Sequence, residues 1–359
     1  MPGFIASSLA SATWPLGAIV ALAADRASPA APAAPAKDAR GARGHPHATL
    51  EEHFGMQFGC VPRLVFISLI YHYVLGDWRS YAKEFAWPWV LRIVLRDILL
   101  ALFTGGVEDF LLLSNSSPFR ASMEKHKYSA AYPRFWEWTA TAPVARDVMW
   151  STCSATIAAL FEAATLHAYA TGRVASGAEG DAWWRHWPTV FLMLSWFYSQ
   201  NIQFYTMHRM LHPWGTKSIP DVGAFLYRHV HSLHHGAKSP TAFSGIAMHP
   251  FESTLYFSYA LFPLLFGAHP MAMLYIKTNL ICAAMLGHSG FESPAQGSQP
   301  HFIHHFYQNV NFAESHVPLD WLFGTFAADK EEAVRRIQER YKGSTVEAAV
   351  VKDLGAKEA

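Results

Sequence analysis

Charged residues are scarce in this chain of 359 residues: they make up 15% of it, against about 25% in an ordinary soluble domain. The net charge is only +1, so the composition gives no field that would attract nucleic acid. The three cysteines form no CxxC pair, which argues against a disulfide framework or a thiolate metal site. The chain is 51% hydrophobic and rich in Phe, Trp and Tyr, which indicates a membrane protein.

Long apolar runs predict the helices of that membrane protein. Residues 87–113, 148–169 and 187–207 are each long enough to cross, or nearly cross, a hydrocarbon core of about 30 Å. Arg92 and Arg96 lie one helical turn apart in the first run, so they either snorkel to an interface or place this helix partly in the membrane surface. Residues 251–287 are nearly uncharged and are broken once, at 267–270. This break predicts a helical hairpin whose two ends lie on the same side.

Composition divides the chain into three regions. Residues 1–56 are rich in Ala and Pro and predict a disordered or targeting segment, whereas residues 57–327 predict one helical membrane domain. Residues 328–359 predict a charged, solvated helix and a polar tail. We therefore expect an all-α membrane protein with a bundle of about four to six transmembrane or re-entrant helices and a histidine-rich metal-binding cap.

Histidines in the second half of the chain follow helical spacing. Twelve of the 20 lie between His208 and His305, in one HxxxH pair, two HxxHH triplets and single positions. Residues three or four apart share a helix face, and imidazole binds Zn, Cu, Fe or Ni. The hairpin brings the last triplet back to the side of the first two clusters. The candidate metal ligands are His208, His212, His231, His234, His235, His288, His301, His304 and His305.

This set is too large for one tetrahedral ion and suits two ions that keep open positions. One HxxxH pair alone would be weak evidence, but three phased clusters on one predicted face are hard to explain by chance. His249 precedes a proline and either binds metal or shapes a substrate pocket, and the pocket is favoured narrowly. His229 is out of phase with its neighbours, and His269 lies in the hairpin turn, so neither is expected to bind metal.

The histidine clusters and their surroundings resemble the fatty acid hydroxylase and sterol desaturase superfamily of membrane proteins over residues 145–327. The resemblance rests on YTMHRMLH at 205–212, YRHVHSLHH at 227–235 and HFIHH at 301–305, followed by NVNF at 309–312 and DWLFGT at 320–325. HPFE at 249–252 and HSG at 288–290 are similar to the sterol-acting branch. Phe302 and Ile303 stand where sterol enzymes often have an acidic or aromatic residue, which leaves the substrate open.

The resemblance implies two iron ions (Fe2+), O2 as co-substrate, and electrons from NAD(P)H through cytochrome b5 or a reductase. It also implies an endoplasmic reticulum membrane protein whose metal site faces the cytosol. We expect desaturation or hydroxylation of a membrane lipid, first of all a sterol or sterol precursor. Fatty acyl or sphingolipid hydroxylation and squalene epoxidation stay open as alternatives. Glu252, Asn309, Asn311 and Asp320 are the polar candidates for orienting the imidazoles.

Two other classes of protein compete with this hypothesis. A zinc-dependent membrane hydrolase usually carries its catalytic glutamate in an HExxH motif, and this sequence has none. A membrane metal transporter or buffer usually carries irregular histidine tracts in loops. The clusters of this chain are helix-phased and spread over about a hundred residues, which favours the oxidase.

Overall fold

The computed structural model describes residues 75–114, 143–175, 186–237, 240–291, 298–314 and 316–358, together with a few isolated positions between 69 and 127. Throughout these ranges the regular structure is helical, and the one β-bridge joins Lys127 to Phe291. The helical class predicted from the sequence is therefore confirmed for this part of the chain. The expected N-terminal segment, 1–56, lies outside the described residues.

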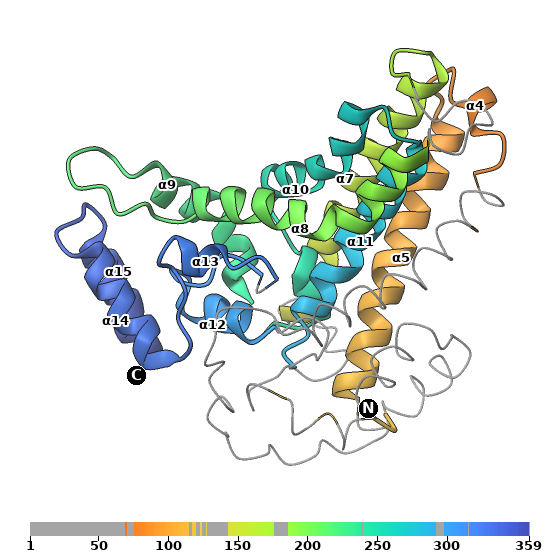
Figure 1. Ribbon diagram of the computed structural model, residues 1–359. Coiled ribbons are helices and arrows are strands. Elements are labelled where there is room, and N and C mark those ends of the chain that lie inside the picture. Colours follow the sequence, from red (N-terminus) through yellow and green to blue (C-terminus); the bar gives the residue numbers. More distant parts are fainter. Residues whose placement is uncertain are drawn as a thin grey trace.

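Four long helices form the bundle that carries the site (Figure 1): α5 (Trp87–Leu113), α7 (Pro143–Ala170), α8 (Trp187–Met210) and α11 (Pro270–Gly287). The three predicted apolar runs lie in α5, α7 and α8, and α4 (Trp78–Tyr81) precedes them. Prolines stand in the first turn of α5, α8 and α11, where a missing N–H breaks no helical bond. α7 packs against α5, and four of its alanines are fully buried: Ala155, Ala158, Ala159 and Ala163.

Residues 250–287 form the predicted hairpin. Its first arm is α10 (Pro250–Phe257) continued by the 3-10 helix η6 (Ser258–Phe266), and its second arm is α11. Gly267 makes the turn with φ 58°, a left-handed conformation that glycine adopts without strain. The hairpin is confirmed, with one difference: the first arm, which contains Pro263, changes from an α-helix to a 3-10 helix at Ser258.

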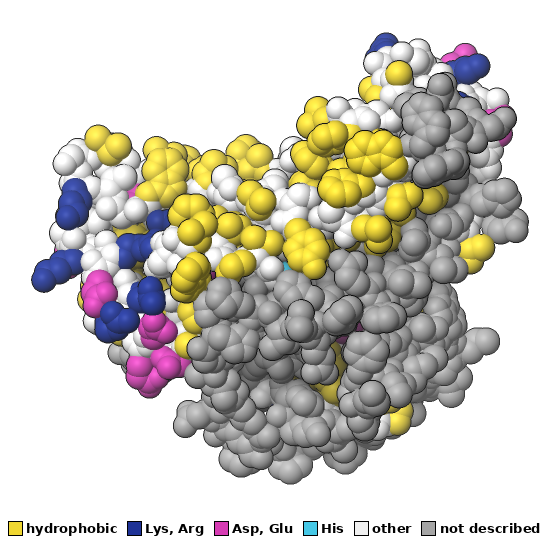
Figure 2. Space-filling model, viewed as in Figure 1, with side chains coloured by type: hydrophobic (Ala, Val, Ile, Leu, Met, Phe, Trp, Pro, Cys, Tyr) yellow, Lys and Arg dark blue, Asp and Glu magenta, His cyan; other side chains and the backbone are white. Residues whose placement is uncertain are grey.

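One helix within the described ranges, α11, has the length and hydropathy of a membrane span, and 83% of it is buried inside the protein. The number of helices that cross a membrane stays a prediction. Apolar side chains are nevertheless exposed along α8, including Trp187, Phe191, Leu194 and Ile202. Figure 2 shows hydrophobic side chains spread over the side of the molecule formed by α8 and α9 (Val222–His229), away from the charged C-terminal helices.

Arg96 does not reach outward to an interface. Its guanidinium lies 2.5 Å from the Glu162 carboxylate of α7 and 2.8 Å from that of Asp97, and the fully buried Lys277 of α11 pairs with the same two carboxylates. Snorkelling, one of the two alternatives given for Arg96, is therefore wrong, because the guanidinium pairs with two buried acids, Asp97 of α5 and Glu162 of α7. Arg92 is exposed and stacks on the Tyr81 ring at 5.3 Å.

The C-terminal helices form a second, smaller core beside the bundle. α12 (Gln299–Tyr307) and α13 (Leu319–Leu322) are followed by α14 (Lys330–Tyr341), which is the expected charged helix, and by α15 (Glu347–Glu358). The expected polar tail is thus a helix, since Val350 and Leu354 pack into one cluster with Ile337 and Tyr341. Figure 2 shows Lys, Arg, Asp and Glu side chains gathered over this end. The remaining elements are the 3-10 helices η4 (His231–Gly236) and η5 (Ala242–Ile246).

Candidate metal centre

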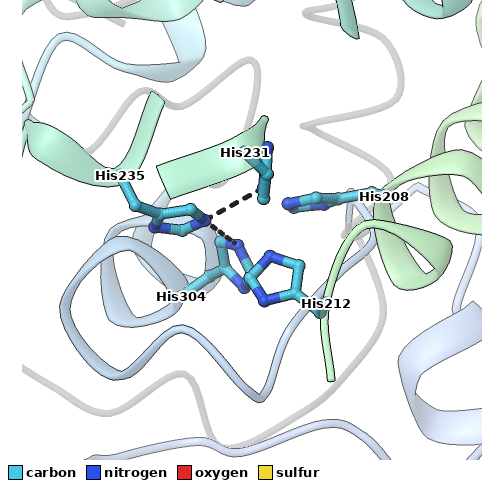
Figure 3. Close-up of side chains that lie close together, drawn as sticks. All are labelled: His208, His212, His231, His235 and His304. Atoms are coloured by element: carbon cyan, nitrogen blue, oxygen red, sulfur yellow. Dashed lines mark hydrogen bonds between the residues drawn. The ribbon is translucent and has the colours of Figure 1, made fainter. Parts of the chain in front are cut away.

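The nine histidines predicted as ligands lie in two neighbouring groups. The first, here called the five-histidine group, contains His208, His212, His231, His235 and His304 (Figure 3), and the second, the four-histidine group, contains His234, His288, His301 and His305. Within each group one nitrogen atom of every ring lies within 4.8 Å of the others, and all nine rings are buried. This is the arrangement expected for two ions rather than one.

Each HxxHH triplet contributes to both groups. His231 and His235 of η4 belong to the five-histidine group, and His234 between them belongs to the other. In α12 the division is reversed, since His301 and His305 join the four-histidine group and His304 joins the first. The sequence indicated that the histidines of each triplet share one helix face. In the structure that face is wide enough for its histidines to point into two different groups. The two groups are thereby tied together through the same two short helices.

Contacts between ring nitrogens have the spacing of ligands around an ion. The Nε2 atoms of His235 and His231 are 3.1 Å apart, and those of His304 and His235 are also 3.1 Å apart. In the four-histidine group, His288 Nε2 lies 3.3 Å from that of His234 and 2.9 Å from that of His301. Two ligands bonded at about 2.1 Å and at right angles would be about 3.0 Å apart. The donor set therefore fits metal ions.

Hydrogen bonds on the far side of the rings fix which nitrogen faces each group. The Nδ1 atoms of His208, His288 and His304 lie 2.8, 2.7 and 2.6 Å from the carbonyl oxygens of Phe312, Ala284 and Val310. A carbonyl only accepts, so Nδ1 must carry the proton and the Nε2 lone pair points into the group. His305 is held in the same way by the Ala237 carbonyl at 3.2 Å. These imidazoles are oriented as metal ligands before any ion binds.

The buried imidazoles are neutral. Burial lowers the pKa of His231 to about 3, and burial together with the nearby His231 lowers that of His288 to about 4, although the bond to Ala284 opposes the second shift. Burial likewise holds the pKa values of His212, His234, His235, His301, His304 and His305 well below 6.5. Neutral imidazole is the form that binds a metal.

Several ring nitrogens are buried without a hydrogen-bond partner. Within the described part of the chain, this holds for Nε2 of His208 and His305 and for both ring nitrogens of His212. A buried polar atom left unpaired is costly, and native structures contain few of them. An ion in each group would remove that cost.

Of the four polar residues expected to orient imidazoles, Glu252 does so directly. Its Oε1 accepts a hydrogen bond from His231 Nδ1 at 2.7 Å, with both side chains buried. The carboxylate thereby holds His231 with its Nε2 toward the five-histidine group. Glu252 lies in the first turn of α10, at the start of the hairpin, which couples the hairpin to the site.

The other three do not contact the imidazoles; they hold the chain segment whose carbonyls bind the histidine rings. Asp320 accepts from the N–H groups of Phe312 and Ala313 at 2.8 and 2.7 Å, and its burial raises its pKa to about 6. Asn311 has φ 53°, which asparagine tolerates, and its amide donates to Pro300 and Ala327 carbonyls. Asn309 accepts from the Tyr341 hydroxyl at 3.2 Å. Together they shape the 309–313 segment, whose carbonyls at 310 and 312 receive His304 and His208.

His249 belongs to neither histidine group. Its Nδ1 accepts from the Phe251 N–H at 3.2 Å and caps α10. It is not among the described residues that line the cavity beside the groups, so its role in metal binding or in the pocket stays a prediction. His229 is exposed at the end of α9, and His269 caps α11 in the same way as His249 caps α10.

A cavity opens beside both groups. His208 and His231 line it from the five-histidine group, and His234 and His288 line it from the other. Its walls are mainly apolar and include Phe204 of α8, Tyr256 of α10 and Ala284 of α11. Such a cavity suits an apolar molecule presented to the two centres.

Sequence reasoning missed these wall residues, although a signal for them exists. Counting back from His208 in steps of four gives Phe204, Gln200 and Trp196, which form one stripe along α8, and all of them line the cavity. Phe312 was also missed as a contact, although its ring packs against those of His208, His212 and His304 at 5.0–5.8 Å.

Comparison with known proteins agrees with this geometry. A family model described as fatty acid hydroxylase matches residues 192–325, which include all nine histidines. A very-long-chain aldehyde decarbonylase of Oryza sativa subsp. indica is 31% identical over 154 residues, which is 39% of this chain and 54% of that protein. A methylsterol monooxygenase of Arabidopsis thaliana (27% identity, 37% of this chain, 51% of that protein) and the lathosterol oxidase of Rattus norvegicus (27%, 40% and 46%) also match.

The chain spans about half the length of the curated relatives it matches. No solved structure matches it. The relatives named above all belong to the superfamily that the histidine motifs resemble, so the resemblance is confirmed. Residues 192–325 of this chain are thus similar to the fatty acid hydroxylase family.

Proposed function

We propose that this protein oxidises a membrane lipid with O2 at a non-haem centre of two iron ions, and that the lipid is a sterol or sterol precursor. The observation that carries the proposal is the pair of all-histidine groups beside one apolar cavity. The imidazoles are buried, neutral and oriented, and they are shared between the groups by η4 and α12.

The donor set favours iron over zinc. Zinc in proteins is almost always four-coordinate and tetrahedral, and a group of five histidines exceeds that number. We propose His208, His212, His231, His235 and His304 as ligands of one ion and His234, His288, His301 and His305 as ligands of the other. Bound iron would supply the redox chemistry with O2, whereas the protein supplies position and exclusion of water.

The roles of the chain itself follow from its contacts. Glu252 holds His231, and the 309–313 segment holds His208 and His304, so the ligands need not reorganise when a substrate arrives. Phe204, Tyr256 and Ala284 form an apolar wall that would hold a hydrocarbon against the centre and keep water away.

The relatives support a lipid substrate. Their names include an aldehyde decarbonylase, a methylsterol monooxygenase and sterol desaturases. The HPFE and HSG segments favour a sterol for this chain. A long-chain aldehyde is the second candidate, because the aldehyde decarbonylases match at up to 31% identity. Fatty acyl or sphingolipid hydroxylation and squalene epoxidation are further alternatives on the same scaffold.

We further propose that residues 57–327 form one membrane domain in the endoplasmic reticulum, with the metal site facing the cytosol. Support comes from α11, from the apolar side chains exposed along α8, and from Arg209 and Arg228 beside the histidine clusters, since cytosolic flanks carry the excess of Arg and Lys. NAD(P)H would supply electrons through cytochrome b5 or a reductase.

Metal analysis combined with O2 uptake tests the function. The full chain, purified in detergent with iron present, should hold about two iron ions, as two groups imply, and consume O2 only when both reductant and lipid are added. Zinc with lipid hydrolysis and no O2 uptake would overturn the proposal in favour of a hydrolase. Metal flux across proteoliposomes without O2 uptake would overturn it in favour of a transporter. Lipid profiles of a deletion strain would then identify the substrate.

A further inference from the structure

Gln200 interrupts an otherwise aromatic stripe that leads to the metal centre. Trp196, Gln200, Phe204 and His208 follow one another at intervals of four residues along α8, and each lines the cavity. Residues at this spacing lie one above another on a single helix face. The Gln200 amide is therefore a polar group set in an apolar wall, on the face that also carries the metal ligand.

The Gln200 side chain is largely buried, yet it forms no hydrogen bond to the described part of the protein. Gln200 is 5% exposed, and within the described part of the chain no hydrogen bond reaches its side chain. Asn201 Oδ1 and Gln203 Oε1 on the same helix are fully buried without a hydrogen-bond partner, whereas the Gln200 amide is open to the cavity that it lines. A ligand in the cavity can therefore reach the Gln200 amide and form the hydrogen bond that the protein does not supply. This geometry points to a ligand at Gln200.

The cavity end around Gln200 carries no positive charge. Phe312 and His316 contact α8 in reverse order along the chain, since the Phe312 carbonyl receives His208 and the His316 ring packs on Phe197 at 4.8 Å. Glu314, which also lines the cavity, adds a carboxylate. No Lys or Arg stands among the described lining residues. An anionic head group would find no partner there, whereas a neutral oxygen would find the amide.

We propose that Gln200 is the anchor for a neutral oxygen head group, a hydroxyl or carbonyl, of the lipid that this protein oxidises; the inference rests on the proposed function and sharpens its substrate. Gln200 precedes His208 by eight residues, roughly 12 Å along the helix. The substrate therefore extends from an alcohol or aldehyde oxygen at Gln200 past Phe204 and Tyr256 to the carbon at the metal centre. Lipids with a free carboxylate or a phosphate ester are not expected to bind with the head group at Gln200, because the described lining offers no positive charge.

A matched pair of probes isolates the contact. Binding of tritiated 1-octadecanol and octadecane to the full chain is measured in nanodiscs, with empty nanodiscs as the blank, on metal-free and on iron-loaded protein. The alcohol should bind roughly three- to tenfold more tightly than the alkane, as one net hydrogen bond allows. In Gln200→Leu that ratio should fall to about one, because the leucine holds the alkane but not the hydroxyl.

Gln203→Leu is the control, since it removes the same group from the same helix without touching the cavity. It should keep the wild-type ratio of alcohol to alkane binding. An unchanged ratio in Gln200→Leu, or a lost ratio in Gln203→Leu, would overturn the assignment.

The charge at this end is tested separately with octadecanoate. The wild-type chain should bind it more weakly than the alcohol, and Glu314→Gln should narrow the gap by removing a carboxylate. Octadecanoate binding as tightly as the alcohol would contradict the proposed selection. Because binding is read on metal-free protein, intact head-group selection without lipid oxidation would overturn the proposed function alone. Lipid oxidation with an unchanged ratio in Gln200→Leu would overturn this inference alone.

Discussion

Two buried polar clusters, built on opposite principles, lie along the hairpin helix α11. Around Lys277, an ion cluster of two cations and two carboxylates joins α5, α7 and α11; its members are Arg96, Asp97, Glu162 and Lys277. At the end of the same helix, His288 belongs to the four-histidine group. In the ion cluster each charge faces its opposite. In the histidine groups neutral nitrogens face one another with no proton donor between most of them.

This difference distinguishes the ion cluster, which stabilises the fold, from the histidine groups, which form a binding site. Opposite charges that pair within the protein need nothing further, so the ion cluster fixes the positions of three helices. Neutral lone pairs that converge need a positive ion, so the histidine groups are complete only with a ligand. The two are connected, because the helix held at Lys277 delivers His288 eleven residues later, roughly 16 Å along the axis.

The largest effect should follow from removing one histidine from each group. His234→Ala and His304→Ala, made separately, should each lower bound iron and reduce O2-dependent lipid oxidation at least a hundredfold, since even partners behind the ligands contribute about that much. Iron per chain and O2 uptake measure the result. His229→Ala, at an exposed histidine of the same region, is the control and should leave both unchanged. Full lipid oxidation in either group variant would show that our ligand assignment is wrong.

Breaking the ion cluster should affect stability instead of metal content. Lys277→Met leaves two buried carboxylates with one cation, and we expect a loss of about 3–5 kcal/mol in the free energy of unfolding. Thermal unfolding of the full chain in detergent measures this loss, and iron per folded chain should stay near the wild-type value.

Lys277→Met combined with Asp97→Leu should recover much of the lost stability, because Arg96 and Glu162 remain as a balanced pair. A double variant as unstable as the single one would mean that Lys277 matters for its packing rather than for its charge.

A smaller change is expected where a carboxylate orients one ligand. Glu252→Ala removes the acceptor of His231 and should weaken iron binding by about 10–100-fold. Glu252→Gln should cost less, because the amide oxygen still accepts from Nδ1. Iron titration of the metal-free chain measures both. Equal losses in the two variants would indicate that the negative charge, and not the hydrogen bond, is what the site needs.

Most of the site was predictable because its signals are local. Helical spacing marked eight of the nine histidines, and the break at 267–270 predicted how the ninth, His288, returns to the others. The hairpin is confirmed, since its first helix contacts His231 through Glu252 and its end contacts His234 through His288. The division of the nine histidines into two groups was not predictable, because it depends on the relative rotation of η4 and α12, and no local sequence pattern indicates that rotation.

The ion cluster and the cavity show why the rest could not be read from the sequence. Arg96, Glu162 and Lys277 are separated by 66 and 115 residues, and only packing of three helices reveals that they are partners. Read alone, a cation in an apolar run predicts snorkelling. Gln200 had a local signal, the stripe of four-residue steps, but its meaning depends on the facing walls of α10 and α11.

Acid gives the most general test of the neutral histidines. The pKa of His231 is lowered to about 3 and that of His288 to about 4, from 6.5. Below pH 6.5 the unfolded chain binds protons that the folded, metal-free chain does not, so stability is full above pH 6.5 and falls as the pH drops toward these values. The slope should be up to about 1.4 kcal/mol per pH unit for each such histidine. Thermal unfolding of metal-free protein between pH 7.5 and 5 measures it.

His231→Gln should reduce that slope by up to the contribution of one histidine. Iron should be lost in step with unfolding rather than before it, since the folded groups stay neutral over this range. A metal-free chain whose stability does not change with pH would mean that the histidines are hydrated in the folded state. In that case the contrast with the ion cluster would fail, because the nitrogens would already have water as their partner.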